Sequence, residues 1–79
     1  MVETRRAPRF RVSKLATIGM GKSAIRCWIH DLSATGAAIA VDTQAGIPER
    51  FTLVIPEDGL QLPCQVVWRK EYRIGVAFE

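Results

Sequence analysis

Short apolar segments of period two, separated by turn signals, constrain the fold of this chain more than any other feature. Apolar and polar residues alternate in five segments, a sixth is short and apolar on both faces, and no segment shows the 3.6-residue period of a helix. The segments cover residues 10–18, 25–30, 37–41, 51–55, 60–68 and 72–78. The sequence therefore predicts an all-β domain of six short antiparallel strands.

Turn-forming residues stand between these segments. Gly19 and Gly21 separate the first two, and Pro56-Glu57-Asp58-Gly59 separates the fourth from the fifth. Residues 42–48 show no alternation and are expected to form a loop or a single helical turn. Six strands joined in this way favour a small closed barrel, because no helix is available to cover an apolar sheet face.

The phase of the alternation predicts which side chains fill the barrel. In the last two segments the expected inward residues are Leu60, Leu62, Cys64, Val66, Trp68, Tyr72, Ile74, Val76 and Phe78. Cys27 and Cys64 are expected to be buried, reduced thiols. Trp28 differs from the other aromatic residues because it shares a face with Arg26 and His30. We expect it at an end of the barrel or beneath another element, with a stacking or contact surface as the alternative.

Length and composition indicate one small globular domain. The chain has 79 residues and is 48% hydrophobic, which is enough for a core and argues against disorder. No uncharged apolar run approaches the roughly 18 residues that cross a bilayer, and no apolar signal-peptide core follows Met1. We therefore expect a cytoplasmic protein that does not insert into a membrane.

The net charge of +3 is concentrated in one segment. Residues 1–11 carry four arginines and one glutamate, whereas the rest of the chain carries seven basic and seven acidic residues. Pro8 excludes a helical interior there. We expect residues 1–11 to be a flexible arm and residues 12–79 to be the barrel domain. A basic arm beside a neutral body indicates an anionic partner, although a solvated tail is the simpler alternative.

The residues that could support catalysis are not arranged for it. His30 neighbours Asp31 and Ser33, but consecutive strand residues are expected to point to opposite faces. The sequence has no glycine-rich phosphate loop and no paired carboxylates in acid and base positions. Cys27, His30 and Cys64 do not have zinc-ligand spacing. We expect no enzymatic activity, no metal and no cofactor.

The arm and the segment Asp31-Leu32-Ser33-Ala34-Thr35-Gly36 are chemically complementary to a guanine nucleotide. Arginine offers a planar donor fork for phosphate or for the O6 and N7 edge of guanine. The Asp31 carboxylate supplies an acceptor for the N1–H and the exocyclic amine on the opposite edge. Ser33 favours a turn, and Gly36 can adopt a positive φ at little cost. Binding is therefore the favoured function.

Two short motifs give the chain a specific resemblance. Arg5-Arg6-Ala7-Pro8-Arg9 fits the RxxxR element of PilZ domains, and the segment from Asp31 to Gly36 fits their (D/N)xSxxG element. Val66-Val67-Trp68 and Ile74-Gly75-Val76-Ala77-Phe78 are similar to the last two strands of that family. The resemblance covers nearly the whole chain and implies a PilZ-like split barrel.

The resemblance also implies a function, a bacterial receptor for the second messenger cyclic di-GMP. Arg5 and Arg9 would grip guanine and phosphate, with Arg6 as a helper, while Asp31 and Ser33 would hydrogen-bond the ligand and Gly36 would leave room for it. The arm would become ordered on binding and present a surface to a protein effector.

PilZ domains commonly carry a C-terminal helix, which is expected to be absent from a chain ending at Glu79. The surface beneath that helix would then be exposed or used by a second copy in a homodimer.

Two other functions remain open. The first is a small barrel that binds single-stranded nucleic acid with the arm as an electrostatic clamp, which would require exposed aromatic residues on a sheet face. Because most aromatic residues fall in the expected core phase, nucleic acid is disfavoured as a partner. The second is a protein-interaction adaptor with the PilZ fold that does not bind nucleotide.

Overall fold

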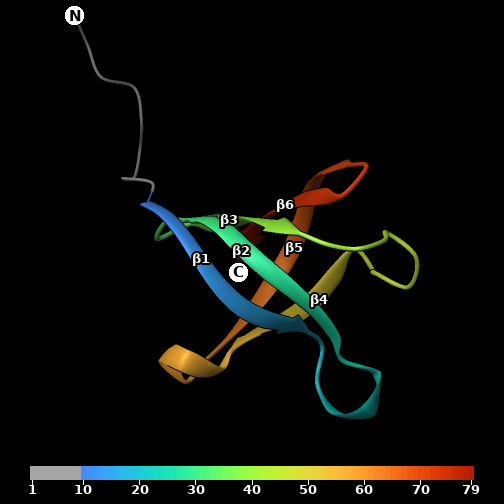
Figure 1. The fold of residues 1–79 in the computed structure, drawn as a ribbon, viewed down its shortest axis with the longest axis horizontal. Coiled ribbons are helices and arrows are strands. Elements are labelled where there is room, and N and C mark those ends of the chain that lie inside the picture. The colour runs from blue at the N-terminus through green and yellow to red at the C-terminus, as the bar shows by residue number, and fades with distance from the viewer. Residues whose placement is uncertain (1–9) are drawn as a thin grey trace, which may run out of the picture.

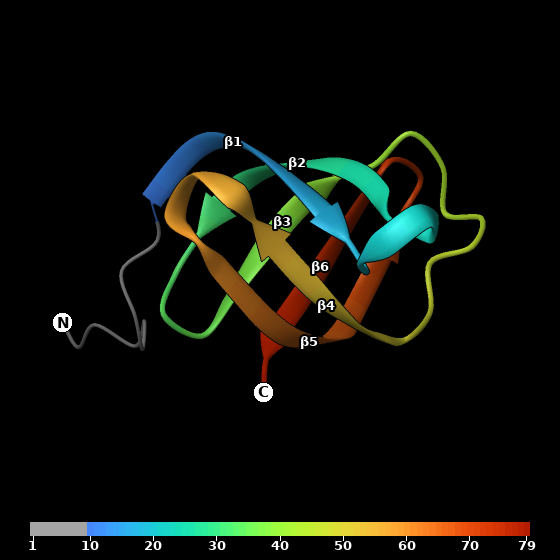
Figure 2. The same ribbon diagram turned by 90° about the horizontal axis from the view of Figure 1, so that it is seen from below.

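Six antiparallel strands close into a barrel, as the alternation of the sequence predicts (Figures 1 and 2). The computed structural model describes residues 10–79. The strands are β1 (Phe10–Ile18), β2 (Ile25–Leu32), β3 (Gly36–Ala40), β4 (Arg50–Ile55), β5 (Leu60–Lys70) and β6 (Arg73–Phe78). Two short 3₁₀ turns are η1 (Gly21–Ser23) and η2 (Pro56–Asp58). Around the barrel the order is β1-β2-β3-β6-β5-β4.

The barrel closes tightly at one end of β1 and is split at the other. β1 pairs with β4 at Thr17 and Ile18, whereas its pairing with β2 extends from Phe10 to Ile18 and is interrupted by a register shift between Arg11 and Lys14. Beyond the β1–β4 ladder, Lys14 Nζ donates to Asp58 Oδ2 at 2.6 Å and so connects β1 to η2. This contact raises the pKa of Lys14 above its ordinary value, chiefly through the hydrogen bond. The split-barrel expectation is met.

The interior is filled by aliphatic side chains from all six strands. Ala16, Ile29, Ile39, Leu53, Ile55 and Ile74 are fully buried. No polar or charged side chain among the described residues is buried with them. Hydrophobic burial from every strand therefore stabilises the barrel without a helix on either face.

Three residues that the alternation assigned to the core are instead exposed. Trp68 is 41% exposed because β5 gains an extra residue relative to β6 between Val66 and Trp68. This β-bulge moves Trp68 to the outer face. Leu60 lies at the start of β5, next to η2, and Tyr72 lies in the turn before β6. Trp28 is exposed on the outer face of β2.

Residues 41–49 form the expected loop, and side chains from β5 and the loop itself hold it in place. Arg69 donates to the carbonyl oxygen of Ile47 at 2.9 Å and to Gln44 Oε1 at 3.1 Å. Gln44 Nε2 in turn donates to the carbonyl oxygen of Arg73 at 3.2 Å. Ile47 is buried beneath these contacts. The loop is therefore fixed against the β5–β6 hairpin.

Cys27 and Cys64 are buried free thiols, as predicted. Burial raises the pKa of Cys27 to about 12 and that of Cys64 to about 11, from an ordinary value of 9.0. Both thiols are therefore protonated and unreactive near neutral pH.

The raised thiol pKa values predict a loss of stability at alkaline pH. Below pH 9.0 the thiols are neutral in both folded and unfolded chains, so their contribution is fully present. Above that value the unfolded chain ionises first, and the free energy of unfolding falls by at most about 1.4 kcal/mol per pH unit for each thiol. Urea denaturation from pH 8 to about pH 10.5 measures this fall. A Cys27→Ala, Cys64→Ala double variant should lose less stability over the same range, and an equal loss would contradict the prediction.

Candidate functional site

A β-bulge brings Asp31 to the surface. Ile29 pairs with Ile39 and Asp31 with Ala38, so β2 has one extra residue, His30, between these pairs. Without the bulge, Asp31 would follow Cys27 and Ile29 into the barrel. With it, Leu32 packs against the core and Asp31 lies half-buried on the outer face.

The same bulge corrects an expectation about His30. Consecutive strand residues were predicted to point to opposite faces, but His30 and Asp31 line one hollow of about 430 Å³ together with Val12 and Arg73. The prediction is wrong here because a bulge interrupts the two-residue period. No third group completes a catalytic arrangement at this hollow among its lining residues.

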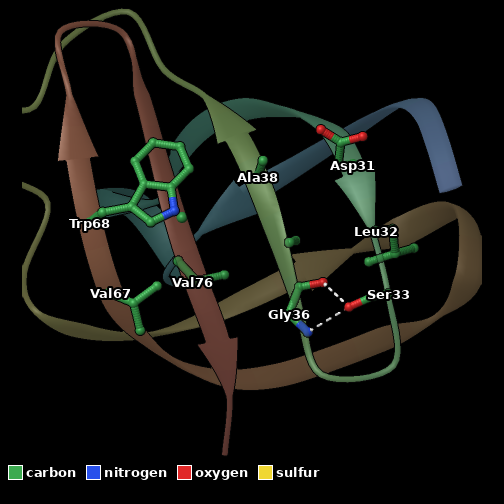
Figure 3. A pocket seen from close by; sticks show the side chains of 10 residues that line it. Asp31, Leu32, Ser33, Gly36, Ala38, Val67, Trp68 and Val76 are labelled. Atoms are coloured by element: carbon green, nitrogen blue, oxygen red, sulfur yellow. Dashed lines mark hydrogen bonds between the residues drawn. The ribbon is translucent and has the colours of Figure 1, made fainter. Parts of the chain in front are cut away.

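Ser33 shapes the turn between β2 and β3. Its Oγ accepts hydrogen bonds from the backbone N–H groups of Thr35 and Gly36, each at 3.2 Å. The hydroxyl also lies 3.3 Å from the carbonyl oxygen of Gly36, to which it donates (Figure 3). The backbone N–H of Ser33 donates to that same carbonyl at 2.9 Å. Ser33 therefore fixes the turn that follows Asp31.

Gly36 is required for close strand packing rather than for a positive φ. Its φ is not among the positive values in the described chain, which occur at Gly19, Gly21, Gly46 and Gly59. A Cβ atom at Gly36 would instead overlap the backbone carbonyl oxygen of Val76 on β6. The positive φ that a glycine allows is not used at Gly36, and the need for glycine comes from the neighbouring strand.

A cavity of about 130 Å³ lies beside this turn. In register across four strands stand Asp31 of β2, Ala38 of β3, Gly75 of β6 and Trp68 of β5. Figure 3 shows Asp31 and Trp68 on opposite sides of β3, with Ala38 between them. Because Ala38 and Gly75 carry little or no side chain, the floor of the cavity lies close to the backbone.

Trp68 and Val67 are cavity residues that the sequence interpretation missed. A Cβ atom at Gly75 would overlap the indole of Trp68, so the ring lies directly against that glycine. The sequence does contain a signal for this arrangement. Val66, Val67 and Trp68 are three consecutive apolar residues, which breaks the period of two and indicates a bulge.

The start of β1 lies at the same place. Phe10 pairs with Leu32 and Arg11 pairs with Asp31 across the β1–β2 ladder. Arg5, Arg6 and Arg9, the predicted ligand-binding residues of the arm, lie outside the described residues. Arg9 immediately precedes Phe10 in the chain, and an extended segment spans at most about 3.6 Å per residue. The described chain therefore begins, at Phe10, one residue after Arg9 and five residues after Arg5.

The described residues form a small barrel with a surface cavity. Within residues 10–79 no group of three or more histidine, cysteine or acidic side chains could hold a metal ion. Across the same residues no helix has the length and apolar character to span a membrane. The cavity beside the β2–β3 turn is lined by one carboxylate, that of Asp31, and one indole, that of Trp68.

Comparison with known proteins gives the family. The model of the PilZ domain matches residues 3–79, so the chain belongs to the PilZ domain family, which comprises binding domains for cyclic di-GMP. A crystal structure of an uncharacterized protein from Legionella is similar, with a TM-score of 0.62 and 18% identity, covering 89% of this chain and 74% of that one. At this identity the likeness shows the fold. No curated protein matches the chain.

Proposed function

We propose that this chain is a bacterial, cytoplasmic receptor that binds cyclic di-GMP in the cavity between Asp31 and Trp68, with Arg5 and Arg9 closing over the ligand. One observation carries the proposal. The cavity that holds the Asp31 carboxylate lies at the strand end whose partner, β1, continues directly into the arginine-rich arm. In the proposed complex the Asp31 carboxylate would supply the acceptor and the arm would supply the arginine donors.

The chemistry of the cavity suits a guanine base. The Asp31 carboxylate can accept from the N1–H and the exocyclic amine of guanine at once, while the exposed Trp68 ring offers a stacking face. The Trp68 indole covers Gly75, and the small Ala38 beside it keeps the floor of the cavity low. Ser33 would exchange its long 3.3 Å contact with the Gly36 carbonyl for a ligand atom.

The arm would supply the phosphate contacts. Arg5 and Arg9 can each clasp a phosphate or a guanine edge with two parallel hydrogen bonds, and Arg6 would assist. Ordering these residues costs conformational entropy, which the charge-assisted contacts offset once the dianionic ligand is present. The ordered arm and ligand together would form the surface that a protein effector recognises.

Calorimetric titration of the chain with cyclic di-GMP tests the proposal. We expect measurable binding heat and a loss of affinity of about 10-fold or more in Arg9→Ala, since a charge-assisted hydrogen bond contributes about 1.5–3 kcal/mol. Cyclic di-AMP, which has the same phosphates but a different base edge, should bind more weakly. In a Trp28→Phe background, the fluorescence of the remaining tryptophan, Trp68, should change on titration. Absence of binding heat together with unchanged Trp68 fluorescence would reject the proposal.

Because several aromatic residues are exposed, single-stranded nucleic acid is a second candidate ligand. Trp28, Trp68 and Tyr72 are all exposed, whereas the sequence alone put Trp68 and Tyr72 in the core. A single-stranded oligonucleotide titrated under the same conditions should bind more weakly than cyclic di-GMP and with a steep dependence on salt. Comparable affinity for the oligonucleotide would favour the nucleic-acid clamp, and no heat with either ligand would favour an adaptor.

A further inference from the structure

A second groove lies on the outer face of β1, β2 and β3, apart from the nucleotide cavity. It has a volume of about 220 Å³, and its lining shares no residue with that cavity. Leu15 and Trp28 are cross-strand partners on its wall, and these two large apolar side chains are 38% and 48% exposed. Ala40, the register partner of Trp28 on the other side, is small and leaves the indole edge uncovered.

The rim of this groove carries one charge of each sign. Arg26 lies two residues before Trp28, and Asp42 lies two residues after Ala40, so the antiparallel register puts the two at the same end of the groove. Both residues are exposed, and within residues 10–79 neither forms an ion pair. The rim therefore has no net charge and does not select a polyanion or a polycation.

A surface with one positive and one negative charge at its rim is complementary to a second copy of itself that is related by a two-fold axis. In an isologous dimer a surface meets itself, so Arg26 of each copy faces Asp42 of the other when the axis passes between them. Because Trp28 and Ala40 are register partners on the same two strands, the same rotation brings the exposed Trp28 of each copy over the small Ala40 of the other. A partner with a uniformly charged surface would satisfy one of the two rim charges and leave the other opposed.

We propose that a second copy of this chain docks in this groove as a two-fold dimer. Trp28 of each copy lies over Ala40 of the other, and two reciprocal Arg26–Asp42 ion pairs set the orientation. Because the apolar patch is small, the dimer is expected to be reversible. The nucleotide cavity stays open in both copies, so the dimer does not depend on the proposed ligand.

Sedimentation velocity of the full chain from about 10 μM to 1 mM tests the dimer. The weight-average mass should rise from that of a monomer toward that of a dimer over this range. Trp28→Ala should shift the midpoint of the monomer–dimer transition at least about 10-fold to higher concentration. Because the variant removes an exposed side chain, its circular dichroism spectrum should show an intact fold. Glu57→Arg, an exposed charge reversal on η2 outside the groove, is the matched control and should not shift it.

A charge-exchange series tests the orientation. Arg26→Asp and Asp42→Arg should each weaken association about 10-fold, because each variant places like charges opposite one another. Combining them restores opposite charges in exchanged positions, so the double variant should recover most of the wild-type association. The proposed dimer would be overturned by any of three results. The wild type could remain monomeric at 1 mM, Trp28→Ala could leave association unchanged, or the double variant could fail to recover association.

Discussion

Gly36→Ala is expected to lower the free energy of unfolding by about 3 kcal/mol, the largest loss from any single methyl group added to this barrel. The added Cβ would overlap the carbonyl oxygen of Val76, which is backbone and is held in the β3–β6 ladder. Relief therefore requires two paired strands to separate, because no side chain can rotate away. Urea denaturation measures the loss, and the melting temperature should fall by more than about 10 °C.

Two other glycines provide controls for this prediction. Gly59 has a φ of 64° but open space around its Cβ position, so Gly59→Ala should cost only the backbone strain, about 1–2 kcal/mol. At Gly75 the obstacle is the exposed Trp68 side chain, which can move. Gly75→Ala should therefore change Trp68 fluorescence at a smaller cost in stability. Equal losses in the free energy of unfolding for Gly36→Ala and Gly59→Ala would contradict the steric explanation.

The strands could be predicted from the sequence because their pattern is local. Alternation of period two along residues 51–55 reports directly which face of a strand is buried. Glycine and proline between the segments mark the chain reversals. Closure followed from a simple physical requirement, since apolar faces without a covering helix must face one another. Family resemblance added the split-barrel form.

The directions of the side chains that follow a β-bulge could not be predicted in the same way. One extra residue at His30 or at Val67 reverses the direction of every later side chain in its strand, and alternation alone does not locate that residue. The sequence held partial signals. Asp31 falls in the same phase as the buried Cys27 and Ile29, where a lone carboxylate would be costly. A charged residue in a core phase therefore indicates a bulge.

The role of Gly36 depended on a contact distant in sequence. The carbonyl oxygen that excludes a side chain there belongs to Val76, forty residues later, and becomes adjacent only when β3 pairs with β6. Local turn chemistry indicated only that a glycine at this position could adopt a positive φ. Motif residues were thus recognisable from the sequence, whereas the reason for each residue type required the strand order.

Asp31→Ala is expected to weaken cyclic di-GMP binding by about 10- to 100-fold without loss of the fold. Simple electrostatics predicts the opposite sign, since removing a carboxylate beside a dianionic ligand relieves repulsion and should strengthen binding. A loss of affinity is expected only if the carboxylate accepts hydrogen bonds from the ligand, as it would from the N1–H and amine of guanine. The direction of the change therefore distinguishes base recognition from phosphate binding alone.

Glu71→Ala is the matched control for this last experiment. Glu71 is an exposed carboxylate in the β5–β6 turn and lines none of the three cavities described above. Its removal changes the net charge by the same amount, so binding should stay equal or become slightly tighter. Calorimetry of both variants with cyclic di-GMP and cyclic di-AMP completes the test. Asp31→Ala should also reduce the preference for guanine over adenine, and tighter binding of cyclic di-GMP by this variant would exclude Asp31 from base recognition.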